Sequence, residues 1–171
     1  MIMETENINT KKNEKNVSNK TLRNKYIFLV LFVIGLVEID IVTKVIFESQ
    51  SFAIIPNFFY IQSTHNDGAG LGILSGKTTL LIVLSCIFLL GFILFDIFYK
   101  KNGKVYLLSI SFIFAGALGN LIDRIFLGYV RDFLFVNIKI MPYYFNFADA
   151  ILTIGIVLFA IDNIFLSKKS K

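Results

Sequence analysis

Two Asn-x-x-Asp patterns, each at an edge of an apolar segment, are the parts of this chain best suited to chemistry. Asn120 and Asp123 lie at the end of the apolar run that begins at Val105, and Asn146 and Asp149 lie at the start of the next one. Residues three apart share a face of a helix, so each Asn lies over its own Asp. Carboxylates are costly in or near hydrocarbon, so two of them at matching depth indicate a function.

A pair of facing carboxylates, Asp123 with Asp149, is the apparatus of aspartic proteolysis. One carboxylate must be ionised to take a proton from water, and the other must be protonated to donate to the scissile carbonyl. Proximity enforces this difference, because two carboxylates about 3 Å apart cannot both hold a charge near neutral pH. Asn120 and Asn146 could orient the carboxylates or bind the substrate backbone. Either aspartate alone would be typical of an interfacial helix end, and it is the recurrence that favours function.

The overall composition identifies an integral membrane protein. Hydrophobic residues make up 56% of the 171 residues and the mean hydropathy is +0.71, whereas soluble domains are roughly 45–50% apolar. One histidine and one cysteine, Cys86, cannot assemble a His/Cys zinc cluster, so neither a metal nor another cofactor is expected. The net charge of +5 is concentrated in the tails and one short loop, which indicates membrane orientation rather than nucleic-acid binding.

Four apolar segments have about the 20 residues that a hydrocarbon core of roughly 30 Å requires. Residues 1–25 are polar and rich in Lys and Asn, which predicts a disordered cytoplasmic tail. We therefore expect an all-α membrane protein whose four-helix domain covers 26–167, followed by a basic cytoplasmic tail at 168–171. The transmembrane helices are predicted at residues 26–47, 78–99, 105–125 and 147–166.

The positions of Lys and Arg predict the orientation. They cluster before the first span, between the second and third, and after the fourth. The positive-inside rule therefore puts both termini in the cytoplasm and the paired carboxylates at the outer side. Asp40 and Lys44, four residues apart and oppositely charged, share a face near the outer end of the first helix. Asp96 and Asp162 fall near cytoplasmic ends and are expected to be solvated.

The long outer connection, residues 48–77, has the composition of a small β-rich platform. Residues 58–64 have the aromatic and β-branched content of a strand. Asn66, Asp67 and Gly68 follow as a turn signal. We expect this extracytoplasmic β-cradle to lie on the outer surface beside the carboxylates.

Other polar residues have simpler interpretations. Arg124 projects about 100° away from Asp123 around a helix, which leaves three interpretations open: it extends toward the membrane surface, pairs with Asp132 or contacts the reacting groups. His65 is interpreted as a loop residue rather than a base. Intramembrane serine and zinc proteases are excluded because neither Gly-x-Ser-Gly nor His-Glu-x-x-His occurs.

Taken in order, the motifs between residues 26 and 166 resemble those of the lipoprotein signal peptidases, also called signal peptidase II. The outer loop contributes Asn57-Phe-Phe and Asn66-Asp-Gly-Ala-Gly-Leu-Gly72, and the first span contributes Asp40-Ile-Val-Thr-Lys44. The most specific blocks are Gly116-Ala-Leu-Gly-Asn-Leu-Ile-Asp-Arg124, Gly128-Tyr-Val-Arg-Asp-Phe133 and Phe145-Asn-Phe-Ala-Asp149. The chain departs from the family pattern at Gly70-Leu71, at Arg131 before Asp132, and in its long N-terminal tail.

The resemblance implies an aspartic endopeptidase of the bacterial cytoplasmic membrane. Its substrate would be a prolipoprotein that already carries diacylglyceryl on a cysteine, cut just before that cysteine at the outer face of the membrane. Membrane lipid and this substrate are the expected partners, and the enzyme is expected to be monomeric. Asp123 and Asp149 would be catalytic, with seven supporting residues: Asp40, Lys44, Asn66, Gly68, Asn120, Arg124 and Asn146.

Two alternatives from other classes were considered. A four-helix proton- or ion-coupled transporter would use Asp123 and Asp149 as a relay, but it predicts carboxylates near mid-membrane rather than clustered on one side. A non-enzymatic membrane scaffold would explain four spans but not the paired Asn-x-x-Asp.

Overall fold

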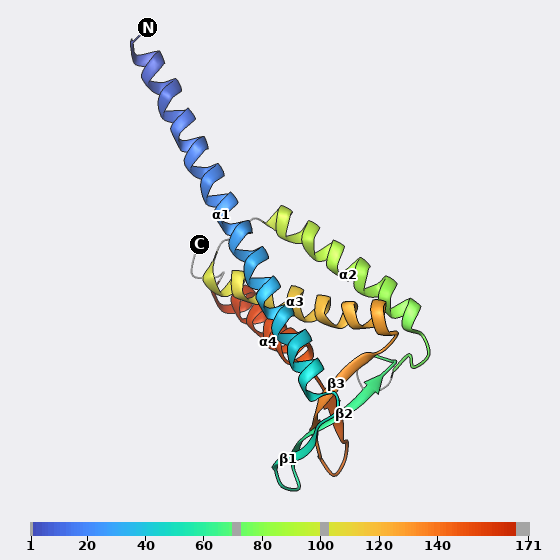
Figure 1. The fold of residues 1–171 in the computed structure, drawn as a ribbon. Helices are drawn as coiled ribbons and strands as arrows, with labels where there is room; N and C mark the ends of the chain where they lie inside the picture. Colours follow the sequence, from blue (N-terminus) through green and yellow to red (C-terminus); the bar gives the residue numbers. More distant parts are fainter. Residues whose placement is uncertain (1, 70–72, 100–102, 167–171) are drawn as a thin grey trace. The chain divides into compact units, whose positions relative to one another are not determined.

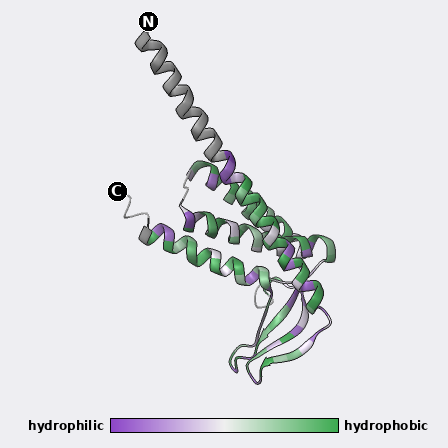
Figure 2. Ribbon diagram, turned by 60° about the vertical axis from the view of Figure 1, so that its left-hand side comes forward, coloured by the Kyte–Doolittle hydropathy of each residue, from purple (hydrophilic) through white to green (hydrophobic). Residues whose placement is uncertain are grey.

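Four apolar helices dominate the structure, a computed structural model that describes residues 2–69, 73–99 and 103–166 (Figure 1). They are α1 (Ile2–Phe47), α2 (Thr78–Tyr99), α3 (Lys104–Leu127) and α4 (Phe147–Ile161), the last continued by a π-helical turn, η2 (Asp162–Leu166). Their spans, Arg23–Phe47, Thr78–Tyr99, Lys104–Leu127 and Phe147–Ile164, have the length and composition to cross a membrane, and hydrophobic residues prevail along them (Figure 2). The prediction of a four-span membrane protein is confirmed.

The first helix is longer than the sequence predicted. Residues 1–25 were expected to lack regular structure, whereas α1 continues back to Ile2. Neither Pro nor Gly occurs in that segment, so nothing in it interrupts helical hydrogen bonding. The chain divides into two compact units, Met1–Phe32 and Val33–Lys171, and the second unit carries the features below. The predicted basic tail at 168–171 lies outside the described residues.

Close contact between α3 and α4 positions the polar residues. A Cβ added at Gly116 would lie 2.5 Å from the Ala148 carbonyl oxygen, and one at Gly155 would lie 2.8 Å from the Ile113 amide nitrogen. These glycines therefore let the two backbones approach closely, as small residues do between membrane helices. The contact brings the first turn of α4 against the second half of α3, where Asn120 lies.

A four-stranded antiparallel sheet adjoins the helices (Figure 1). The strands β1 (Ser51–Ile55), β2 (Phe59–Asn66), β3 (Val130–Val136) and β4 (Tyr143–Phe145) pair in chain order. The first two fall in the connection predicted to be β-rich, and the last two come from the connection after α3, which the sequence did not identify as strands. The pairing of β2 with β3 sets Thr64 opposite Asp132 and therefore joins the two connections.

The prediction that Asp96 and Asp162 are solvated helix ends is wrong. Both side chains are buried, with 6% and 3% of their surface exposed. The Asp96 carboxylate accepts a hydrogen bond of 2.9 Å from the Tyr106 hydroxyl. A carboxylate removed from water requires such a partner, so this end of the bundle is a packed polar contact rather than a solvated surface.

Candidate active site

Asp40 and Lys44 form a fully buried ion pair on α1. Lys44 Nζ lies 2.7 Å from Asp40 Oδ2, and neither side chain is exposed. Asp40 Oδ1 also accepts the backbone N–H of Ala148, one of the free amides at the N-terminus of α4 (2.9 Å). Lys44 further donates to Asn120 Oδ1 (3.1 Å) and lies 3.4 Å from Asp123 Oδ2. This pair therefore ties α1 to both α3 and α4.

Asp123, on α3, is held by cations. Arg131 binds both of its oxygens, with Nη2 2.7 Å from Oδ1 and Nε 3.2 Å from Oδ2. The Arg131 backbone N–H donates to Oδ2 as well (3.1 Å). Only 1% of Asp123 is exposed. With Lys44 added, its carboxylate has the partners typical of an ionised group.

Asp132, on β3, is equally buried but has neutral partners. Its Oδ1 accepts from Asn146 Nδ2 (2.7 Å) and its Oδ2 accepts from Asn66 Nδ2 (2.9 Å). Burial and the negative charge of Asp149 raise the pKa of Asp132 from its ordinary value of 3.8 to about 6. The negative charge of Asp149 therefore disfavours ionisation of Asp132.

Asp149 is fixed by the start of α4. It forms a reciprocal capping box with Asn146, in which the Asp149 backbone N–H donates to Asn146 Oδ1 (2.9 Å) and Asp149 Oδ2 accepts the Asn146 backbone N–H (3.2 Å). Asp149 Oδ1 accepts from Asn120 Nδ2 (2.7 Å). Since Asn146 also donates to Asp132, one buried asparagine orients both carboxylates.

The turn after β2 is bonded to the polar cluster through Asn66 and Arg124. The Asn66 side chain accepts the backbone N–H of Gly68 (3.0 Å), and Arg124 Nη2 donates to the Gly68 carbonyl (2.9 Å). The Asp67 carboxylate accepts hydrogen bonds from Ser75 Oγ (2.6 Å) and from the Gly76 backbone N–H (3.0 Å). Gly70-Leu71, where the chain departs from the family pattern, lies outside the described residues.

A cavity of about 420 Å³ opens onto Asp132. Its walls come from β2 and the turn after it, and from the segment that leads into β4. Burial and the charges of Asp149 and Asp132 raise the pKa of Tyr143, which lines it. His65 lies on β2 rather than in the predicted loop. It lines the cavity and stacks on the Tyr129 ring. The full lining is Thr64, His65, Asn66, Asp67, Asp132, Met141, Pro142, Tyr143 and Tyr144.

The predicted supporting residues meet in this one cluster: Asp40, Lys44, Asn66, Gly68, Asn120, Arg124 and Asn146. Asp132 is the residue that sequence reasoning missed, since it was considered only as a partner for Arg124. Asp132 could have been identified from its position in the block Gly128-Tyr-Val-Arg-Asp-Phe133, which is one of the motifs that carry the family resemblance. Among the described residues, no group of three or more His, Cys, Asp or Glu side chains is arranged to hold a metal ion.

Comparisons with known proteins show which family the chain resembles over most of its length. The model of the family described as Signal peptidase (SPase) II matches residues 31–165. A relative from Clostridium novyi, named Lipoprotein signal peptidase, is 37% identical over 149 residues, which cover 83% of this chain and 99% of the relative. A relative of the same name from Staphylococcus carnosus is 41% identical over 158 residues, covering 85% and 96%. A solved bacterial membrane enzyme superposes with a TM-score of 0.73 at 39% identity, covering 84% of this chain and 90% of that one.

Proposed function

The chain belongs to the signal peptidase II family of aspartic peptidases, and we propose that its catalytic pair is Asp132 with Asp149. Its activity is the removal of signal peptides from prolipoproteins. The ion-coupled transporter considered above finds no support among these relatives. We further propose that the substrate carries diacylglyceryl on the cysteine that follows the scissile bond, and that the enzyme acts as a monomer, because the linked polar cluster comes from one chain.

The observation that carries the proposed pair is the setting of Asp132. It is buried, it is bonded by amides rather than cations, and its pKa is raised to about 6, in part by Asp149. In the reaction, the ionised carboxylate of the pair takes a proton from water, whose oxygen attacks the scissile carbonyl carbon. The protonated carboxyl donates to the carbonyl oxygen, and a proton then passes to the leaving nitrogen as the C–N bond breaks. The two titrations belong to the pair rather than to either residue.

The pairing expected from the repeated sequence pattern, Asp123 with Asp149, is the second candidate. Three Arg131 contacts and Lys44 surround the Asp123 carboxylate. A carboxylate in that setting is a poor proton donor, because protonation would break a bidentate pair with a cation. The geometry therefore favours Asp132 over Asp123.

Three isosteric variants separate the two pairs. Asp132→Asn and Asp149→Asn are each expected to lower turnover of a lipidated precursor by about 10³-fold or more, because the amide cannot exchange a proton. Asp123→Asn should lower turnover less than the other two variants do, when each variant is assayed at its own optimum pH. The exposed Glu38→Gln on α1 is the control. Full activity of Asp132→Asn together with an inactive Asp123→Asn would instead select the pair Asp123 with Asp149.

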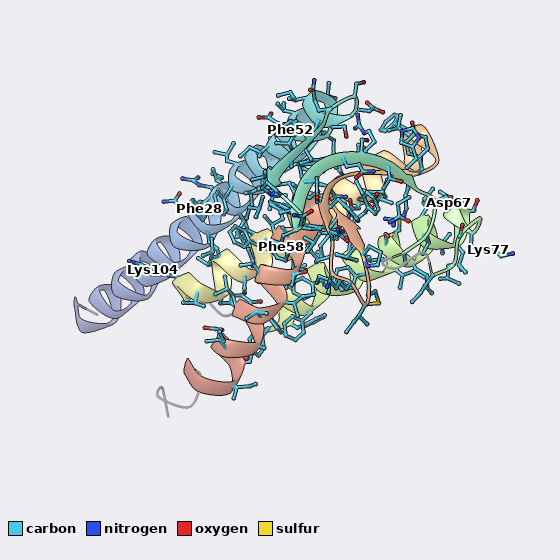
Figure 3. All side chains as sticks on the ribbon, turned by 90° about the horizontal axis from the view of Figure 1, so that it is seen from below. Phe28, Phe52, Phe58, Asp67, Lys77 and Lys104 are labelled. Carbon is cyan, nitrogen blue, oxygen red and sulfur yellow. The ribbon has the colours of Figure 1, made fainter. Side chains whose placement is uncertain are left out.

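We propose that the sheet and the carboxylates face the outer side of the cytoplasmic membrane, with both termini inside. The distribution of Lys and Arg supports this orientation. The sheet and its loops also expose large apolar side chains, as expected of a surface that meets lipid. They are Ile54, Ile55, Ile138 and Ile140, together with Phe52 and Phe58, which are labelled in Figure 3. In a Cys86→Ala background, an impermeant thiol reagent on intact cells should label a cysteine at position 139 and spare one at position 104. The opposite labelling would reverse the orientation.

Dependence on substrate lipid tests the remaining part of the proposal. Burial of acyl chains contributes roughly 0.8 kcal/mol per CH₂, which confines the substrate to the membrane surface. The unlipidated precursor should therefore be cleaved about 100-fold more slowly by purified enzyme in detergent, an order-of-magnitude value for lost positioning. Equal rates on matched lipidated and unlipidated precursors would remove the lipid requirement and leave the peptidase.

A further inference from the structure

A third buried carboxylate lies in the cluster that contains the proposed pair. Asp123 is linked to Asp149 through Lys44 and Asn120, since Lys44 contacts Asp123 and donates to Asn120, and Asn120 donates to Asp149. The mechanism requires one proton on the Asp132–Asp149 pair. A neighbouring carboxylate that is buried and poorly neutralised would compete for that proton.

Lys44 alone does not neutralise Asp123. Its ammonium lies 2.7 Å from Asp40 but farther from Asp123, at 3.4 Å, and it also donates to Asn120. Arg131 supplies the missing charge, with two side-chain bonds to Asp123. The side chain of Arg131 also lies 3.6 Å from Glu48, but that carboxylate is far more exposed than Asp123 and therefore largely screened by water.

The charges of the cluster balance only when Arg131 is included. Four aspartates face three cations, Lys44, Arg124 and Arg131, so the cluster is neutral when a single carboxylate holds a proton. The four aspartates are Asp40, Asp123, Asp132 and Asp149. An apolar residue at position 131 would leave the same protonation state with one uncompensated negative charge in a buried region.

We propose that Arg131 is a positioning residue, which neutralises Asp123 so that the one catalytic proton stays on the Asp132–Asp149 pair. This inference rests on the proposed catalytic pair. Arg131 immediately precedes Asp132 on β3, so its contacts with α3 also anchor the strand that presents Asp132. Arg131 contacts Asp123 on α3 and Glu48 after α1, and it pairs with His65 across β2 and β3. Lys44 and Asp40 on α1 lie on the other side of Asp123. The charge of Arg124 on α3 and the ionisation of Tyr143 on β4 are coupled to Asp132 and Asp149.

The pH dependence of kcat/KM distinguishes this role from a purely structural one. In Arg131→Met, the acid and alkaline limbs should both move to higher pH by about one pH unit, because removal of a buried positive charge favours protonation of the carboxylates that remain. Arg131→Lys keeps the charge and should keep both limbs in place. Glu48→Gln, which removes the exposed partner of the same arginine, is the matched control and should leave both limbs unmoved.

The double variant Arg131→Met with Asp123→Asn is the decisive measurement. It removes the competing carboxylate together with its cation, so both limbs should return to their wild-type positions. Limbs that stay in place in Arg131→Met, with activity lowered equally at every pH, would overturn the inference and leave the catalytic pair intact. Full activity of Asp132→Asn would overturn the pair itself, and the inference with it.

Discussion

Asp123 and Asp132 are both buried to the same extent, with 1% of each side chain exposed, yet their partners are opposite in kind. Arg131 and Lys44 surround Asp123, whereas Asn66 and Asn146 bond Asp132. Cations strongly favour the ionised form of a carboxylate, so Asp123 is suited to holding α1, α3 and β3 together. Neutral amides favour the charged form less, and the charge of Asp149 opposes it, so Asp132 is suited to exchanging a proton. Burial alone therefore does not identify the reactive carboxylate.

Asn120 and Asn146 connect the ion-paired region around Asp123 with the proton-exchanging region around Asp132. Asn120 accepts from Lys44 and from Asn146 on its oxygen and donates to Asp149 from its nitrogen. Hydrogen bonds in such a chain polarise one another. The ion-paired region therefore orients the proton-exchanging region through amides, since Asn146 bonds Asp132 and Asn120 bonds Asp149.

Removal of Lys44 should break the ion-paired region and give the largest change in stability. Lys44→Met leaves buried Asp40 without its ion-pair partner, a change that typically costs about 3–5 kcal/mol. We expect a large fall in the unfolding temperature in detergent micelles. The double variant Asp40→Asn with Lys44→Met should recover part of this loss, because no lone buried charge remains. Unchanged stability of Lys44→Met would mean that the ion pair contributes little.

The proton-exchanging region predicts a dependence of stability on pH. The pKa of Asp132 in the folded protein, about 6, lies above its ordinary value of 3.8. The folded state therefore binds this proton more tightly, and the resulting stabilisation is complete below about pH 4 and lost as pH rises through 6. The full effect corresponds to about 3 kcal/mol, of which roughly half is lost between pH 5 and pH 8.

Asp132→Asn removes this titration, so its unfolding temperature should fall less than that of the wild type between pH 5 and pH 8. Comparison of two pH values for each protein cancels any constant effect of the amide on hydrogen bonding. Equal falls in both proteins would show that Asp132 is ionised over this whole range. The exposed Asp67→Asn is the matched control, because Asp67 has a lowered pKa and titrates below the range.

The sequence was sufficient to predict the helices and most of the cluster. Long apolar runs identify spans because a hydrocarbon core demands about 20 apolar residues, and buried charged residues such as Lys44 are conspicuous in such runs. The spacing of Asn146 and Asp149 likewise predicted a shared face, which the structure realises as a capping box.

What the sequence did not reveal depends on contacts between distant segments. The strand β3 is recognisable as part of a sheet only once it pairs with β2, and that pairing brings Asp132 to Asn66. The repeated Asn-x-x-Asp pattern drew attention to Asp123, because sequence spacing cannot show that Arg131 folds back onto it. Residues 1–25 were misjudged for another reason, since polar composition alone does not prevent a helix from continuing.

A single added methyl group offers the smallest and most local test of the comparison. A Cβ at Gly119 would lie 2.5 Å from Asp40 Oδ2 and 3.3 Å from Ala148 Cβ, so Gly119→Ala should disturb only the ion-paired side, at a typical overpacking cost of about 1–3 kcal/mol. Gly91→Ala on α2 is the matched control, because nothing lies within 4 Å of its added Cβ and alanine favours a helix by up to about 1 kcal/mol. The unfolding temperature should therefore fall for the first variant and hold or rise for the second. If the two regions are separable, Gly119→Ala should also leave unchanged the pH dependence of stability that is assigned to Asp132. A shifted pH dependence would mean that the Asp40–Lys44 pair sets the protonation of Asp132.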